Sequence, residues 1–182
     1  MALEFTTSYL SDALPLFRHY KKLGDRAIEQ ITDEQLFLTL DDEANSIAII
    51  VKHMAGNMKS RWRDFLTSDG EKPDRDRDSE FETPPTTRTE VLTLWEAGWN
   101  TLFHALEELT DDDLSRTVTI RGEAHSVIQA INRQLAHLPY HIGQIVLLAK
   151  HFVGSDWQTL SVARRASGEY NRKVAAGELS QR

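Results

Sequence analysis

The chain has 182 residues and contains no cysteine, which excludes disulfide bonds, a cysteine nucleophile and thiolate metal sites. Its 21 lysine and arginine residues against 28 aspartate and glutamate residues give a net charge of -7 at pH 7, which argues against nucleic acid and anionic membranes as partners. The length predicts a single domain over residues 1–182. With no apolar run long enough to span a membrane and no basic, cleavable leader at the N-terminus, we expect a cytoplasmic protein.

Two amphipathic helices are predicted in the first part of the chain. Over about residues 7–31, apolar side chains recur at three- and four-residue steps, a period typical of a helix with one buried face. A second helix is expected to begin near Asn45 or Ser46, both good N-caps, and to end before the turn signal at Ser68. Residues 69–86 are rich in charge and proline and have no apolar period, so they predict a long surface crossover with solvated charges.

Two further helices are predicted in the second half, each preceded by a capping box. Thr87 with Glu90, and Ser126 with Gln129, match the pattern in which the N-cap side chain and the third helical side chain bond each other's backbone. Apolar residues follow each box at helical spacing. Between these helices, TVTIRGEAH at residues 117–125 predicts a short hairpin.

These elements together predict an all-α fold, a four-helix bundle with a long crossover after the second helix. The sequence ITDEQL at residues 31–36 follows the first helix, and the similar LTDDDL at residues 109–114 follows the third. The echo suggests two helix pairs related by a pseudo-two-fold axis. From Asp156 onward, we expect a C-terminal extra segment that forms a peripheral helix or an ordered tail.

Three of the seven histidines are candidate metal ligands. His137 and His141 are four residues apart, so they share one face of the predicted fourth helix, and His53 has the corresponding position beside the apolar stripe of the second. If these helices pack side by side, three imidazoles converge, a set that suits Zn, Ni or Fe(II) and leaves a position open for water or substrate. The alternative is three core histidines bonded to carbonyl groups, in a bundle that acts as a binding or interaction protein.

Other residues near the three histidines are candidates for supporting the ligands or lining a pocket: Asn57, Gln134, Tyr140 and Gln144. No carboxylate stands out as a general acid or base, so the catalytic group stays unknown, and Glu123, Tyr140 and Gln144 are candidates from proximity alone. Pro139 lies between the two histidines of the fourth helix and removes a backbone hydrogen bond there, so we expect the helix to bend or break.

The histidine pattern His53 then His137-x-x-x-His141, with the closing run INRQLAHLPYHIGQIVLLAK, resembles the DinB-like (DinB/YfiT) superfamily over nearly the whole chain. The strings SIAIIVKHMAGNMKSRW and RDRDSEF look like a bacterial branch of that superfamily. The resemblance implies an up-down-down-up bundle, a homodimer, and a divalent metal ion held by these three histidines. It also implies an activity like that of relatives similar to metal-dependent hydrolases, or to S-transferases that use thiols such as bacillithiol or mycothiol.

The absence of cysteine fits the transferase alternative, because a metal ion can bind a cosubstrate thiol, lower its pKa and present it as the thiolate. We therefore expect transfer of a low-molecular-weight, bacillithiol-like thiol to an electrophilic small molecule. The alternative is a hydrolase in which the same ion activates a metal-bound water.

Overall fold

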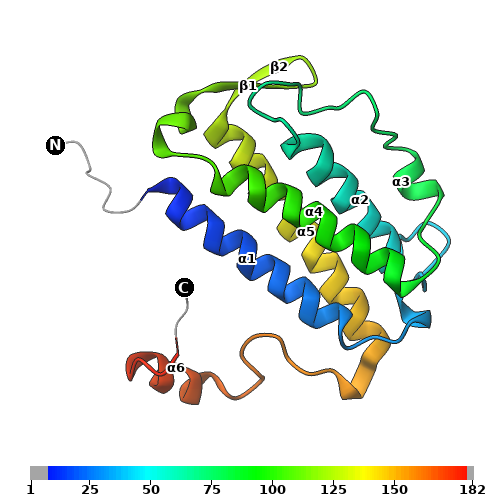
Figure 1. Cartoon of the computed structure of the whole chain (residues 1–182). Coiled ribbons are helices and arrows are strands. Elements are labelled where there is room, and N and C mark those ends of the chain that lie inside the picture. Colours follow the sequence, from blue (N-terminus) through cyan, green and yellow to red (C-terminus); the bar gives the residue numbers. More distant parts are fainter. Residues whose placement is uncertain (1–7, 180–182) are drawn as a thin grey trace.

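Four long helices form the bundle in the computed structural model, which describes residues 8–179 (Figure 1). They are α1 (Tyr9–Ile28), α2 (Ile47–Trp62), α4 (Arg88–Glu107) and α5 (Val127–Val153). In Figure 1, α1 and α5 run in one direction and α2 and α4 in the other. α1 packs mainly on α5, and α2 mainly on α4. The expected up-down-down-up bundle is therefore what the chain forms.

The remaining elements are short and lie in the connections between the bundle helices or after α5. They are the 3₁₀ helices η1 (Glu34–Leu36), η2 (Asp111–Ser115) and η3 (Gly154–Asp156), the helices α3 (Ser79–Glu82) and α6 (Ser167–Ala175), and the strands β1 (Thr117–Ile120) and β2 (Glu123–Ser126). The two strands form the predicted antiparallel hairpin, with Thr117 opposite Ser126. α6 is the C-terminal extra segment. No helix in the described part of the chain is both long enough and apolar enough to cross a membrane.

Three residues predicted as N-caps are the N-cap residues of bundle helices in the structure. The Ser46 side chain accepts a hydrogen bond from the backbone of Ile49 at the start of α2. Both predicted capping boxes are formed, one at Thr87 before α4 and one at Ser126 before α5. Since a good cap contributes about 1 kcal/mol, these local interactions fix where the bundle helices start.

The two similar segments that follow α1 and α4 adopt the same local structure. Each forms a short 3₁₀ helix, η1 in the first half of the chain and η2 in the second. Each also inserts one leucine into the core, Leu36 and Leu114. The similarity between the two sequence segments therefore corresponds to a repeated turn. In each half of the chain, this turn precedes the helix that carries histidines of the cluster, α2 or α5.

The closest approach between α2 and α4 depends on a glycine. A Cβ atom built on Gly98 of α4 would lie 2.8 Å from the Cα atom of Ala55 on α2. The bulky core side chains Trp95 and Trp99 lie one turn before Gly98 and next to it on the same helix, and both are fully buried. The absence of a side chain at Gly98 thus lets the two helix backbones approach each other.

The crossover is more ordered and more buried than the sequence indicated. It contains the short helix α3, and it buries Lys72 and Glu80 to 7% and 4% exposure. The prediction of solvated charges was wrong for these two residues, whereas Asp74, Asp76 and Asp78 are exposed as expected. Arg75 of the same segment pairs with the Glu80 carboxylate and compensates its burial.

The proline between the two histidines does not break the fourth helix. α5 runs without interruption from Val127 to Val153 with Pro139 inside it. Leu138 and Ile142, on either side of the proline, are buried in the core, and this packing offsets the missing backbone hydrogen bond. His137 and His141 therefore keep the spacing of one helical turn.

Candidate metal centre

Three histidine side chains converge between α2 and α5. The Nε2 atom of His137 lies 3.3 Å from Nε2 of His53 and 3.1 Å from Nε2 of His141. One ring nitrogen from each residue lies within 4.8 Å of the other two. Because α2 and α5 pack side by side, residues 84 positions apart in the chain meet at one point, as the sequence predicted.

The outer ring nitrogens of two of these histidines are held by acceptors. Nδ1 of His53 donates to Oε2 of Glu80 at 2.8 Å, and Nδ1 of His141 donates to Oε1 of Gln144 at 2.8 Å. A proton fixed on Nδ1 leaves the lone pair on Nε2, which faces the other rings. The acceptors therefore set the tautomer in which these two rings act as metal ligands.

His137, the third ring of the cluster, lacks such a partner. Its Nδ1 atom is buried, with no hydrogen-bond partner among residues 8–179. Burial, with the neighbouring His141 and His53, lowers the pKa of His137 to about 3. Burial also lowers the pKa of His141, although Gln144 opposes this. Both rings thus resist protonation and keep the neutral form that binds metal ions.

The donor set fits a divalent ion. Two nitrogen ligands that each lie about 2.0–2.1 Å from a tetrahedral ion are about 3.3–3.4 Å apart, close to the two Nε2 separations measured from His137. Without an ion, at most one proton can lie between each pair of facing nitrogens. A cation would satisfy all three lone pairs at once, and imidazole nitrogens suit Zn, Ni or Fe(II).

A buried carboxylate supports His53 from the crossover. Oε1 and Oε2 of Glu80 accept hydrogen bonds from Nε and Nη2 of Arg75, at 2.8 and 3.0 Å. Burial raises the pKa of Glu80, but the hydrogen bonds from His53 and Arg75 outweigh it, so the pKa is below its ordinary value. Glu80 is therefore an ionised acceptor for the His53 ring.

The position of Glu80 beside His53 also requires a glycine on α2. A Cβ atom built on Gly56 would lie 2.2 Å from Oε1 of Glu80. Sequence reasoning missed Glu80 and Arg75, because the crossover has no apolar period, and it missed the role of Gly56, because that role depends on the position of Glu80. The only available signal was the string RDRDSEF, residues 75–81, which belongs to the family resemblance.

The predicted supporting residues have different positions. Gln144 holds His141, and its Nε2 atom donates to Oη of Tyr140 at 3.4 Å. Asn57 and Gln134 line the adjacent pocket, but their side chains bond each other at 3.2 Å rather than a histidine. Glu123 lies exposed on β2 and is not among the residues that line the pocket.

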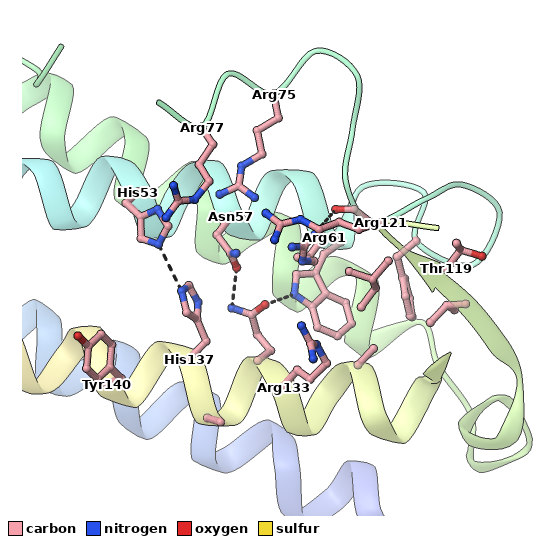
Figure 2. Close-up of a pocket in the computed structure, with 18 residues that line it drawn as sticks. His53, Asn57, Arg61, Arg75, Arg77, Thr119, Arg121, Arg133, His137 and Tyr140 are labelled. Atoms are coloured by element: carbon pink, nitrogen blue, oxygen red, sulfur yellow. Dashed lines mark hydrogen bonds between the residues drawn. The ribbon is translucent and has the colours of Figure 1, made fainter. Parts of the chain in front are cut away.

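A pocket of about 570 Å³ lies beside the histidines, between α2, α5, the crossover and the hairpin (Figure 2). His53 and His137 form part of its wall, together with Asn57, Gln134 and Tyr140. Tyr140 is 64% exposed and marks its edge. A small molecule in this pocket would therefore have direct access to the nitrogen cluster.

Replacement of Glu80 by glutamine tests the support of His53. We expect metal affinity to fall about 10- to 100-fold, the usual cost of losing the partner of a ligating histidine. The affinity is measured by competition with a chromophoric chelator, and circular dichroism checks folding. Glu82→Gln is the control, because Glu82 is exposed on the same short helix. Equal affinities for Glu80→Gln and the control would contradict a supporting role.

Comparison with known proteins identifies a family and a fold. Residues 4–166 match the family described as "Protein of unknown function (DUF1572)". Among solved structures, the chain is similar to the crystal structure of a DinB-like protein from Bacillus cereus ATCC 10987. The TM-score is 0.61 and the sequence identity 15%, over 76% of this chain and 89% of that chain. A search of curated proteins gave no match. At this identity the structural likeness shows the fold, a DinB-like helical bundle.

Proposed function

The chain belongs to the DUF1572 family and has a DinB-like fold, and we propose that it is a divalent-metal-dependent enzyme with His53, His137 and His141 as ligands. The observation that carries the proposal is the convergence of three imidazole nitrogens beside a pocket. A bound Zn, Ni or Fe ion would act as a Lewis acid that lowers the pKa of a thiol or a water molecule. Glu80 and Gln144 orient two of the rings for this task.

The proposed reaction is transfer of a low-molecular-weight thiol to an electrophilic small molecule. The sulfur forms a bond to the electrophilic carbon, the bond to the leaving group breaks, and the thiol proton passes to solvent. The chain contains no cysteine, so the sulfur nucleophile has to be a cosubstrate. The pocket volume of about 570 Å³ lies within the range usual for small-molecule sites.

The residues around the pocket favour a thiol over water as nucleophile. None of the described residues that line the pocket is aspartate or glutamate, and the nearby Glu80 is already bonded to His53 and Arg75. His137 is itself one of the proposed ligands, so its lone pair would not be available to take a proton from water. A thiol with a pKa near 8.5 needs less help to ionise than water, whose pKa is about 15.7. Metal-assisted hydrolysis is the second candidate.

An assay with and without thiol separates the two reactions. The metal-loaded protein is incubated with bacillithiol and 1-chloro-2,4-dinitrobenzene, and in parallel with p-nitrophenyl acetate and no thiol. We expect the dinitrophenyl chromophore to form faster than with thiol alone, and only while the three histidines hold metal. His141→Ala, treated identically, is the control. Ester turnover without thiol would favour the hydrolase, and no acceleration in either arm would contradict both reactions.

The family resemblance also implies a homodimer, which stays a proposal. Tyr140 and Leu147 are seven residues apart on α5 and each is 64% exposed. They share one helix face, because seven residues make nearly two turns. An interface over this strip would cover apolar surface next to the mouth of the pocket.

A further inference from the structure

The pocket beside the histidines is lined by basic side chains, although the chain as a whole is acidic. Its wall contains five arginines and, among the described lining residues, no carboxylate. They come from α2, the crossover, the hairpin turn and α5: Arg61, Arg75, Arg77, Arg121 and Arg133. With a net charge of -7 for the chain, this concentration of positive charge is local. A concave site of one charge sign attracts ligands of the opposite sign.

Three of these arginines share two acidic partners that are not among the residues lining the pocket. Glu71 accepts from Arg61 at 2.9 Å and from Arg121 at 3.0 Å, and it lies 3.4 Å from Arg75. Arg75 also pairs with Glu80. Three guanidinium groups are therefore in ion-pair contact with two carboxylates. This cluster fixes the side chains in place and does not neutralise them fully.

Two arginines have more of their hydrogen-bonding capacity free. Within residues 8–179, Arg133 has no hydrogen bond or ion pair through its side chain, and it precedes His137 by one turn of α5. Arg77 lies over the ring of Phe81, 5.1 Å from its centroid, and reaches Asp78 only at 4.0 Å. In Figure 2, Arg77 extends from the crossover and Arg133 from α5, on opposite sides of the pocket. A ligand between them can be contacted from both sides.

We propose that this pocket binds a small molecule with a carboxylate or phosphate group, and that Arg133 and Arg77 pair with this group. Guanidinium groups bind both anions through two parallel hydrogen bonds, with shorter and stronger contacts than neutral donors make. Residues four apart on a helix lie about 5–6 Å apart, so an anion held by Arg133 places the rest of a small molecule next to His137. The identification of this molecule as the substrate rests on the proposed function, whereas the anion site itself does not require the metal ion.

Binding of two simple anions to metal-free protein tests the site. Inorganic phosphate and succinate are titrated separately by isothermal calorimetry into wild type, Arg133→Gln and Arg172→Gln. Arg172 lies exposed on α6, so its variant has the same change in net charge away from the pocket. We expect at least one anion to bind wild type and the control equally, and to bind Arg133→Gln about tenfold or more weakly, the usual effect of losing a hydrogen bond to a charged group. The anion that binds more tightly identifies the chemical group.

The results also separate this inference from the metal proposal. His141→Ala is expected to bind the anion as wild type does. No binding of either anion, or equal binding by wild type and Arg133→Gln, would overturn the anion site while leaving the metal centre as proposed. Anion binding that depends on Arg133 would support the site even if wild type contained no metal. In that case only the enzymatic role of the pocket would be lost.

Discussion

Replacement of His141 by alanine is expected to remove stoichiometric metal from the protein and to leave the bundle folded. The variant loses one of three nitrogen ligands, so its affinity should fall by more than the roughly 10- to 100-fold expected when only a supporting partner is lost. His141 lies at the edge of the core rather than among its fully buried side chains, so folding should survive. Metal content is measured by elemental mass spectrometry on tag-free protein, and folding by circular dichroism.

The matched control for this experiment is His151→Ala. His151 belongs to the same helix but is exposed at its C-terminal end, so its loss should leave the metal content unchanged. Metal that persists in His141→Ala at the wild-type level would place the ion elsewhere. A wild-type protein that binds no metal even after incubation with divalent ions would mean that the three histidines are structural, and the enzyme proposal would then be dropped.

Replacement of Gly98 by alanine should destabilise the protein by about 1–3 kcal/mol, the usual cost of overpacking a core. The added methyl group would meet the Cα atom of Ala55 at 2.8 Å, and a backbone atom cannot move aside as a flexible side chain can. α2 and α4 would have to separate, which weakens the contacts around them. The free energy of unfolding is measured by urea denaturation.

Gly143→Ala on α5 is the opposite case and the control. Beyond the adjacent backbone of its own helix, no atom of the described part of the same chain lies within 4 Å of a Cβ built on Gly143, so in the monomer alanine should stabilise the helix by up to about 1 kcal/mol through its higher helix propensity. The two variants make the same chemical change in two helices, and only the space around them differs. Equal effects on stability would show that the packing of Gly98 does not limit the approach of α2 and α4.

The sequence predicted those parts of the fold that depend on local patterns. The caps at Ser46, Thr87 and Ser126 involve residues only three apart in the chain, and the helices follow from the apolar period. The histidine cluster was also predictable, because His137 and His141 are one turn apart. His53 then required only that its helix pack beside theirs.

The rest of the site depends on contacts that no local pattern encodes. Glu80 and Arg75 lie in a charged segment that reads as solvent-exposed, and they are buried only because each compensates the other next to His53. Asn57 and Gln134 line the pocket, but position on a helix face does not decide which neighbour an amide bonds. The effect of Pro139 could not be predicted either, since it depends on how tightly the surrounding helix is packed.

The placement of Glu80 on the crossover rather than on a bundle helix links two equilibria. The crossover both holds the His53 ring and contributes Arg75 and Arg77 to the pocket. If the proposed ion and the proposed anionic ligand both bind, each depends on the same position of the crossover, the ion through Glu80 and His53 and the ligand through Arg77. Because such coupling is reciprocal, the two should bind with positive cooperativity, and an empty pocket should lose its ion more readily than a filled one.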